Sequence, residues 1–314
     1  MIVVRQPDDL PRPGQRRTVL TIGTFDGLHH GHQVILGRVT ERARALDADA
    51  ALVTFHPHPL RVLAPDRAPR LLLTVEQKLA LLEQAGLDLV AVLPFDRALA
   101  TMPAEVFARE TLARRLRAVE VYVGPDFRFG RGRAGNLDLL RRLGPGLGFT
   151  ADAPGLVLDR GARISASRIR GELSQGNVAE ATRLLGRAYR LVGTIVHGEG
   201  RGRNVLVPTA NLAAENEFLP ARGVYVTRTL RPAGQAVDGV TNIGTRPTFG
   251  ESRITVETFL PGFTGDLYGE RVELEFHVRL RDEKMFETPA DLMAQIRRDL
   301  EEFERWRGGG GAGG

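Results

Sequence analysis

Cysteine is absent from the 314-residue sequence. Its absence excludes disulfides, thiolate nucleophiles and cysteine-ligated zinc sites. The sequence also has no run of roughly 18 apolar residues, the length that a membrane-spanning helix requires. Residues 1–11 have neither the apolar centre nor the small-residue cleavage site of a signal peptide. We therefore expect a soluble, globular protein that works in the cytoplasm without a membrane partner.

Lysine is almost absent, because only Lys78 and Lys284 occur among 43 lysine and arginine residues. Lys78 is followed by leucine and Lys284 by methionine, so neither completes the GxxxxGK[ST] sequence of a P-loop. Arginine is scattered among 38 acidic residues, with a formal net charge of +5. Scattered charge is typical of a solvated surface, so we expect no nucleic-acid partner. Salt-dependent oligonucleotide binding tests the competing hypothesis of a nucleic-acid-binding protein.

The first 187 residues alternate apolar runs with helical stretches. Thr74 and Gln77 form a capping box at the start of one predicted helix. Four apolar runs are typical of strands in a parallel sheet. They lie at residues 19–22, 51–55, 88–93 and 119–124. The repeated strand and helix units predict an α/β domain with a doubly wound parallel sheet over residues 1–187.

From residue 188 the apolar residues alternate with a period of two. The segments that show this are residues 190–198, 223–230, 236–244, 253–260 and 270–280. Such spacing suits an antiparallel barrel or sandwich, and we expect a β-barrel. One helix follows, which begins at Thr288 and has an inward apolar stripe. The stripe consists of Leu292, Ile296, Leu300 and Phe303. The second domain is predicted to span residues 188–307, and the glycine-rich residues 308–314 to form a disordered tail.

Three histidines cluster in TIGTFDGLHHGHQVIL, residues 21–36, directly after the first predicted strand. An open α/β sheet binds ligands at this edge, where the N–H groups at a helix start attract phosphate. Gly23 allows a tight turn close to a ligand. His29 and His32, spaced as H-x-G-H, can place imidazole donors against phosphate oxygens, and Gly31 leaves room for the nucleotide.

Two other interpretations of H-x-G-H stay open at this point. One is a polar strand-to-helix turn with no chemistry. The other is a metal site, although no acidic ligand lies at a recognisable zinc spacing. Class I aminoacyl-tRNA synthetases pair H-x-G-H with a lysine-rich loop, which a chain with two lysines cannot supply.

Residues 163–171, RISASRIRG, can take the place of that loop. Ser165 and Ser167 offer hydroxyl groups, and Arg168 offers a cation at a predicted helix start. The alternative is a simple N-cap of a helix over residues 167–173.

Several separated motifs carry a resemblance to a known family. Those in the first half are GTFDGLHHGHQ, TFHPHP, VGPDFRFGRGRAGN and ISASRIR. Those in the second half are GTIVHGEGRGRNVLVPTANL, GVYV, GVTNIGTRPTFG, VETFL, DLYGERVELEFHVRLRDEKMF and DLMAQIRRDL. Together they resemble, in order and over nearly the whole chain, the prokaryotic bifunctional riboflavin kinase and FAD synthetase. The resemblance implies two transferase reactions: phosphorylation of riboflavin to FMN by ATP, and adenylyl transfer from ATP to FMN, which gives FAD and pyrophosphate.

The resemblance implies that the first half holds the adenylyltransferase site. His29 and His32 are then expected to bind and polarise the phosphates of ATP. Ser165, Ser167 and Arg168 are expected to hold the phosphates from the opposite side. The other expected nucleotide-binding residues are Gly23, Phe25, Gly31 and Asp126. Because in-line displacement needs little covalent help, positioning and charge neutralisation with Mg²⁺ are expected to do most of the work.

The resemblance also implies a kinase site in the second half. Thr209 and Asn211, in PTAN, are expected to be oxygen ligands of a Mg²⁺ that also touches ATP. Glu257, in VETF, is expected to accept the proton of the ribityl hydroxyl group as it attacks. Without the resemblance, PTAN is equally well an exposed turn, and Glu257 an ordinary strand residue.

Two places depart from the family pattern. Leu206 and Val207 stand where the family usually has a glycine and an aromatic residue before PTAN, and Phe259 stands where histidine is common. A β-carbon at Leu206 can crowd a loop that approaches the phosphates. The alternative function is therefore an FMN adenylyltransferase with a weak or inactive kinase-like barrel.

Overall fold

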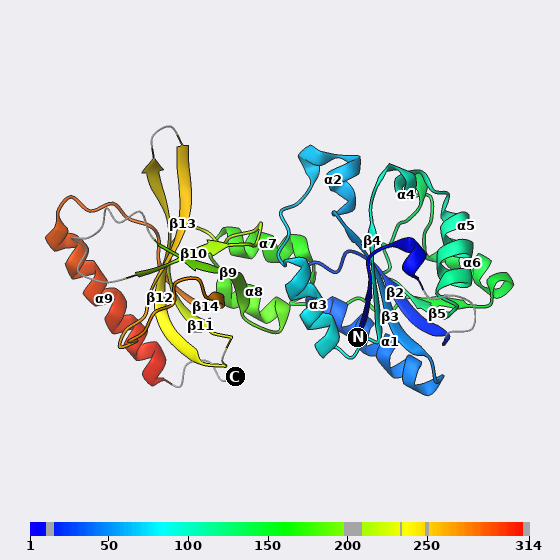
Figure 1. The fold of residues 1–314 in the computed structure, drawn as a ribbon, viewed down its shortest axis with the longest axis horizontal. Coiled ribbons are helices and arrows are strands. Elements are labelled where there is room, and N and C mark those ends of the chain that lie inside the picture. Colours follow the sequence, from blue (N-terminus) through cyan, green and yellow to red (C-terminus); the bar gives the residue numbers. More distant parts are fainter. Residues whose placement is uncertain (11–15, 198–208, 233, 249–250, 310–314) are drawn as a thin grey trace. The chain divides into compact units, whose positions relative to one another are not determined.

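The computed structural model of the chain describes residues 1–10, 16–197, 209–232, 234–248 and 251–309. Contacts within the chain divide it into two compact units, Met1–Ser165 and Ala166–Gly314 (Figure 1). The described residues of the first unit contain a sheet of six strands and a small two-stranded sheet, and those of the second unit contain a closed barrel of six strands.

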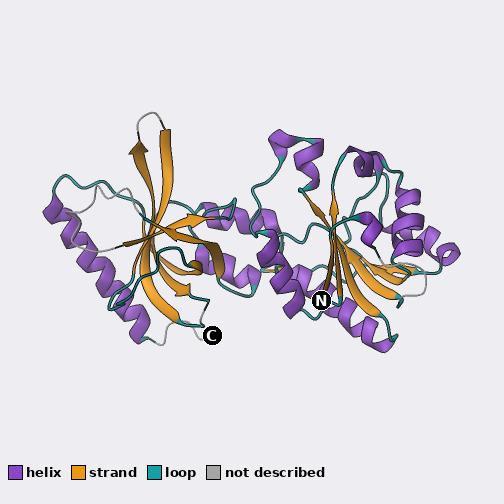
Figure 2. Ribbon diagram, viewed as in Figure 1, coloured by secondary structure: helices purple, strands orange, loops and turns teal. Residues whose placement is uncertain are grey.

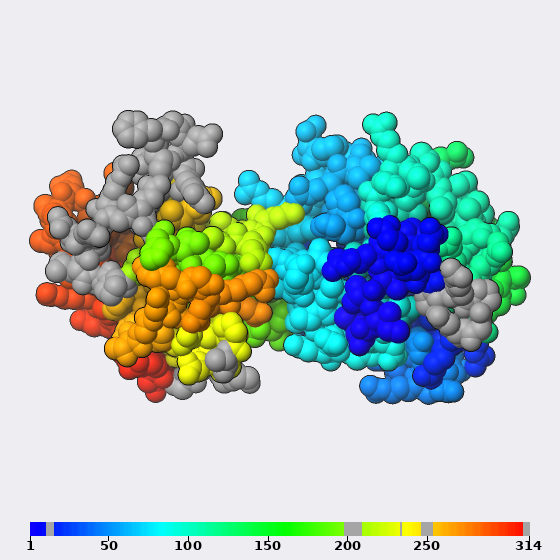
Figure 3. Space-filling model, viewed as in Figure 1, coloured from blue at the N-terminus to red at the C-terminus, as the bar shows by residue number. Residues whose placement is uncertain are grey.

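The first unit is built on a parallel sheet with the strand order β1-β4-β3-β2-β5-β6. Its strands are β1 (Ile2–Val4), β2 (Thr18–Ile22), β3 (Asp49–His56), β4 (Leu89–Pro94), β5 (Ala118–Tyr122) and β6 (Thr150–Asp152). The four predicted strands are confirmed as β2 to β5. The edge strands β1 and β6 have three residues each, too few for a periodic pattern. In Figure 3 the N-terminal residues, coloured dark blue, lie at the surface, and Ile2 is 67% exposed.

Helices cover both faces of this sheet, so the doubly wound prediction is confirmed (Figure 2). Leu36 and Leu82 pack with Val19 on one face, and Leu112 and Leu140 pack with Leu20 on the other. Val19 and Leu20 are consecutive in β2, and consecutive strand side chains point to opposite faces. The helical segments are α1 (His30–Ala45), α2 (Pro59–Leu63), α3 (Val75–Gln84), α4 (Arg97–Thr101), α5 (Ala104–Val106), the π-helix η3 (Phe107–Arg115) and α6 (Leu137–Leu147).

The central strand β2 pairs with β3 on one side and with β5 on the other. The chain leaves β2 through α1 toward β3 and later returns to β5, so the direction of winding reverses beside β2. Ligands of open α/β sheets bind at such a switch point, beyond the carboxyl ends of the strands. The loop that follows β2 leads into the H-x-G-H motif at the start of α1.

The second unit is a closed antiparallel barrel with the order β10-β13-β12-β11-β14-β9, which confirms the predicted barrel. Its strands are β9 (Tyr189–Val196), β10 (Thr209–Ala214), β11 (Gly223–Leu230), β12 (Ala236–Thr248), β13 (Glu251–Phe259) and β14 (Arg271–Arg281). β10 was not predicted as a strand, because its sequence TANLAA lacks a β-branched alternation. The residues of PTAN that the structure describes therefore lie in a strand and not in a turn.

The described residues of this unit also form three helices: α7 (Ala166–Ser174), α8 (Val178–Leu185) and α9 (Pro289–Gly308). α8 contacts β9 and β14 and buries Ala181 and Leu184 completely. The contacts consequently divide the chain before α7, earlier than the predicted boundary after residue 187. The Thr288 side chain accepts from the N–H of Asp291, as expected of the cap of α9. The predicted tail contributes Gly308 to the end of α9, and residues 310–314 lie outside the described residues.

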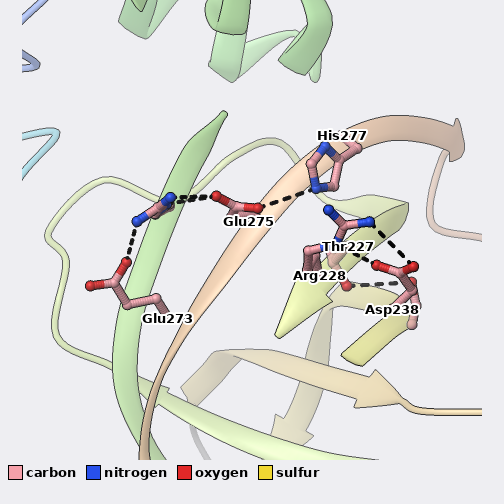
Figure 4. A network of polar contacts seen from close by, with 8 residues as sticks. Thr227, Arg228, Asp238, Glu273, Glu275 and His277 are labelled. Carbon is pink, nitrogen blue, oxygen red and sulfur yellow. Dashed lines mark hydrogen bonds and ion pairs between the residues drawn. The ribbon is translucent and has the colours of Figure 1, made fainter. Parts of the chain in front are cut away.

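A polar network ties together four strands of the barrel (Figure 4). Arg190 of β9 donates to Glu273 and Glu275 of β14, at 2.8 Å each. His277 lies 3.5 Å from Glu275, and hydrogen bonding to His277 is the largest of the effects that lower the pKa of Glu275. Arg228 of β11 donates to Asp238 of β12 at 2.7 Å. None of these charged residues lies on β10 or β13, the strands that carry the predicted kinase residues. The network therefore stabilises other strands of the barrel.

Candidate active sites

A pocket of about 430 Å³ lies at the switch point of the first unit. The loops after β2 and β5 form two of its walls, and further lining residues come from the segments 55–63, 154–157 and 163–165. Seven predicted residues line it: Gly23, Phe25, His29, Gly31, His32, Asp126 and Ser165. The structure therefore brings the H-x-G-H motif together with residues up to 136 positions away in sequence (165 − 29).

The loop from Gly23 to His29 has an unusual backbone. Phe25 and Leu28 have φ angles of 48° and 41°, values that residues with a β-carbon seldom adopt, and Gly27 has 77°. Gly23 donates its N–H to the carbonyl of Val53 on β3 at 3.0 Å. Strained conformations of this kind cluster at functional sites, where the surrounding structure holds them in place.

Three rings of this segment are stacked. The centroids of His29 and His32 lie 3.8 Å apart with an interplanar angle of 15°, and Phe25 stacks on His32 at 4.4 Å. His29 is the N-cap residue of α1, and its carbonyl accepts from the N–H of His32 at 2.8 Å. The stack fixes both imidazoles at the start of α1, where a phosphate group is electrostatically favoured.

Gly23 and Gly31 make room for rings of the stack. A β-carbon at Gly31 would lie 3.2 Å from two atoms of the His29 ring, and one at Gly23 would lie 3.0 Å from the Phe25 ring. Both contacts are tighter than ordinary packing allows. Gly31 was expected to leave room for the nucleotide; it lines the pocket, and a β-carbon there would also press on the imidazole of His29.

His32 is held in the neutral form. Burial is the largest of the effects that lower its pKa well below 6.5, followed by the charges of His29, Lys78 and Arg163. Its Nδ1 is buried and has no hydrogen-bond partner among the residues that the structure describes. A neutral imidazole with an unsatisfied nitrogen is suited to a polar ligand in the pocket. The described residues contain no group of three histidine, aspartate or glutamate side chains that could hold a metal ion.

An ion pair also lines this pocket. Arg163 on the short strand β8 (Ala162–Arg163) pairs with Asp126 in the loop after β5. Arg163 also lines the pocket and was missed as a site residue, although its position two residues before Ser165 offered the signal. Ser167 and Arg168 lie in the first turn of α7, in the second unit, so their part in this site stays a prediction.

A second cavity, of about 180 Å³, shares part of its wall with the first. Both are lined by Phe55, Pro59, Leu63, Phe127, Arg128 and Arg133. The smaller cavity has three further aromatic walls, Phe95, Phe107 and Phe129. Phe55 and Phe95 meet edge to face at 5.7 Å, whereas Phe127 and Phe129 are stacked at 5.4 Å. The structure therefore provides a cavity lined by aromatic rings next to the pocket of the histidines, which the sequence did not predict.

The predicted kinase residues lie side by side on neighbouring strands. Asn211 of β10 is the register partner of Glu257 of β13, which is in turn the partner of Asn242 of β12. Thr209 lies two residues before Asn211 and therefore on the same face of the barrel wall. Thr255 donates its hydroxyl to a carboxylate oxygen of Glu257 at 2.9 Å. One face of the barrel thus carries a hydroxyl, an amide and a carboxylate group in neighbouring positions.

This set of oxygen atoms fits Mg²⁺. The Asn211 amide nitrogen donates to the Thr209 carbonyl at 3.5 Å, which leaves the amide oxygen available as a ligand. Hydroxyl, amide and carboxylate oxygens are hard donors of the kind that Mg²⁺ prefers. Phe259 is the register partner of Thr209, whereas Leu206 and Val207 lie outside the described residues.

The sequence missed two further polar residues here. One is Asn242, next to Glu257. The other is Glu283, whose carboxylate accepts from the N–H of Thr245 at 2.8 Å. A β-carbon at Gly244 would lie 2.6 Å from this carboxylate, so a larger residue there would displace the Glu283 side chain. A cavity of about 220 Å³, lined by Thr209, Thr258, Phe263, Asp266 and Tyr268 among others, adjoins the same strands.

Comparisons with known proteins cover both units. A family model described as FAD synthetase matches residues 12–168, and one described as Riboflavin kinase matches residues 185–307. The bifunctional riboflavin kinase/FMN adenylyltransferase of Escherichia coli K12 is 36% identical, over 95% of this chain and 96% of its own. The protein of that name in Bacillus subtilis 168 is 32% identical, over 97% of each chain.

A solved structure is also similar over nearly the whole chain. It is the crystal structure of a protein from Streptococcus pneumoniae described as a macrolide-efflux protein. It is 28% identical, with a TM-score of 0.87 over 98% of this chain and 100% of that one. In the part of the present chain that the structure describes, no helix is long and apolar enough to cross a membrane.

Proposed function

The chain belongs to the family of bifunctional riboflavin kinase/FMN adenylyltransferases, and from this premise we propose which of its residues perform the two reactions. It phosphorylates riboflavin to FMN with ATP, and it transfers the adenylyl group of ATP to FMN, giving FAD and pyrophosphate. None of the comparisons favours the alternative of a barrel without kinase activity.

Adenylyl transfer is assigned to the pocket at the end of β2. An oxygen of the FMN phosphate attacks the α-phosphorus of ATP, and the bond from that phosphorus to the bridging oxygen breaks, releasing pyrophosphate. Negative charge increases on the phosphate oxygens in the transition state. The stacked imidazoles of His29 and His32 and the N–H groups of the first turn of α1 are placed to stabilise it.

The remaining contacts with ATP are assigned to the part of the pocket that contains Asp126, Arg163 and Ser165. Arg163, held by Asp126, supplies positive charge, and Ser165 supplies a hydroxyl group. Ser167 and Arg168 are proposed to contact the phosphates from the start of α7. The aromatic cavity suits the flat isoalloxazine ring of FMN, because aromatic rings stack favourably on one another. Arg128 and Arg133 line both cavities and are therefore placed near the phosphate of FMN.

Riboflavin phosphorylation is assigned to the face of the barrel that carries Glu257. The Glu257 carboxylate takes the proton of the terminal ribityl hydroxyl, whose oxygen attacks the γ-phosphorus of ATP, and ADP leaves. Thr209 and Asn211 are proposed to hold Mg²⁺. When bound, the ion neutralises charge on the phosphates. The observation that supports this assignment is the direct pairing of Asn211 with Glu257.

We assign adenylyl transfer to residues 1–187 and kinase activity to residues 188–307. The compact units divide earlier in the chain, because α7 and α8 belong to the unit that contains the barrel. We further propose that the enzyme works in the cytoplasm, where its two ATP-consuming reactions have a ready supply of that substrate.

The single observation that carries the adenylyltransferase assignment is the stacked pair of His29 and His32 in the switch-point pocket. The purified protein, given riboflavin, ATP and Mg²⁺, tests the whole proposal when the flavins are separated by chromatography. We expect FMN to form and then to be converted to FAD. Formation of FAD from supplied FMN, but not from riboflavin, contradicts the kinase assignment.

A further inference from the structure

Lys78 is a buried lysine beneath the nucleotide pocket. Its side chain extends from α3, the residue is 8% exposed, and its Nζ donates to the carbonyl of Thr24 at 2.8 Å. Burial lowers the pKa of Lys78, and the nearby Asp26 carboxylate offsets part of this effect. Lysine is rarely buried, since an ammonium group loses its hydration there. One of the two lysines in the chain thus lies where a charged group is energetically unfavourable.

The carbonyl that Lys78 contacts is a fixed point of the H-x-G-H loop. The Thr24 carbonyl also accepts from the hydroxyl of Thr54 on β3, at 3.3 Å, and Thr54 is completely buried. Phe25 follows directly in sequence, and its ring stacks on His32. A displacement of the Thr24 carbonyl therefore moves the ring against which His32 rests.

A second contact ties the same loop to the segment before α3. The Asp26 carboxylate, in a residue that is 4% exposed, accepts from the N–H groups of Leu72 at 3.0 Å and Leu73 at 3.4 Å. Lys78 and Asp26 thus hold the residues on either side of Phe25, whose φ of 48° is unfavourable without such support.

We propose that Lys78 is a positioning residue for adenylyl transfer: its ammonium group, acting through the Thr24 carbonyl, holds Phe25 and the His29–His32 pair in place against the phosphates of ATP. This inference rests on the proposed function of the pocket. Lys78 is not among the described residues that line the pocket, so it acts through the loop and not on the nucleotide. The ammonium group matters because a neutral side chain of similar length leaves the carbonyl with the single, longer contact to Thr54.

The replacement of Lys78 by methionine removes the charge and the donor while keeping an unbranched side chain. A histidine pair that has lost its support stabilises the transition state less well, whereas most ground-state contacts of ATP remain. We expect kcat for FAD formation from FMN to fall about 10- to 100-fold, with KM for ATP within about threefold of the wild-type value. Lys284→Met changes the exposed lysine and serves as the matched control, for which the same rate is expected to stay unchanged.

Because the chain has no cysteine, the ammonium group can be restored chemically. Lys78→Cys is alkylated in the unfolded state with bromoethylamine, which adds an ammonium group at nearly the length of lysine, or with iodoacetamide, which adds a neutral amide. Both products are refolded. The wild-type chain taken through the same steps is the control, and circular dichroism with thermal unfolding measures the folded fraction.

We expect the aminoethylated protein to recover kcat to within about threefold of the treated wild type, and the neutral product to stay as slow as Lys78→Met. Equal rates of the two folded products overturn the inference, whether both are fast or both are slow. A wild-type rate in Lys78→Met overturns it as well. A different result contradicts the proposed function itself: the wild-type protein forms no FAD from FMN.

Discussion

Asn211 on β10 and Glu257 on β13 are direct partners in the wall of the barrel. Side chains in such positions on one face have their β-carbons about 4.5–5.5 Å apart. A residue proposed to hold Mg²⁺ and the proposed general base are therefore fixed as neighbours by the backbone pairing of two strands. Asn242, the partner of Glu257 on its other side, extends this polar row to a third strand.

Glu257→Gln tests the role of this carboxylate. Glutamine keeps the size and an acceptor oxygen but cannot take a proton, so kcat for FMN formation is expected to fall roughly 10²- to 10⁴-fold. The apparent affinity for riboflavin should change much less, because the hydroxyl can still be held. FMN production is measured at saturating riboflavin, ATP and Mg²⁺, with FAD production from FMN as the internal control. A fall of less than about threefold would make Glu257 an ordinary strand glutamate.

Arg163→Gln tests the cation that lines the pocket of the histidines. The loss of its charge should raise KM for ATP in adenylyl transfer about tenfold, since a hydrogen bond to a charged group contributes roughly 1.5–3 kcal/mol. Arg141→Gln is the matched control, because Arg141 is also a half-exposed arginine paired with an aspartate, Asp152, but does not line the pocket. Equal KM values for the two variants would remove Arg163 from the site.

The part of the site that sequence could predict is the part that is local. His29, His32 and Gly31 lie within four consecutive residues, after a strand and before a helix, so their joint position at a phosphate site follows from two neighbouring elements. The parallel sheet and the barrel were likewise predictable, because their apolar patterns repeat within each strand. β10 escaped detection since its residues TANLAA show no such pattern.

The rest of the site depends on contacts between distant segments. The aromatic cavity combines Phe55, Phe95, Phe107 and Phe129, each from a different segment, and no spacing along the chain relates them. Lys78 contacts Thr24 across 54 positions, and its burial is visible only once α3 packs on the sheet. Gly244 of β12 lies close to Glu283, which follows β14 in the chain. The sequence around Gly244 does not show this approach.

The neutral state of His32 leads to a prediction about pH. Its pKa in the folded protein lies well below 6.5, the value for the exposed ring, so below pH 6.5 the unfolded chain binds a proton that the folded chain does not. The contribution of His32 to the free energy of unfolding is therefore fully present above about pH 6.5. It is lost as the pH falls toward the pKa that His32 has in the folded protein. His32→Phe keeps an aromatic ring against Phe25 but cannot titrate, so the thermal unfolding of the first unit should depend less on pH over this interval.

The same prediction can be checked by observing the ring itself. Proton NMR of the histidine Cε1 resonances, with His32→Phe used for the assignment, should show that His32 stays neutral at pH 6.5. A His32 resonance with its midpoint at or above pH 6.5 would contradict the account of burial.

The division of two reactions between two units is tested most directly by His32→Ala. This variant is incubated with riboflavin, ATP and Mg²⁺, and the flavin products are separated by chromatography. Because His32 lies in the first unit and Glu257 in the second, we predict that FMN forms at nearly the wild-type rate and accumulates, with no conversion to FAD. Loss of FMN formation in parallel with FAD formation, in a protein that circular dichroism shows to be folded, would contradict the assignment of the two reactions to separate units.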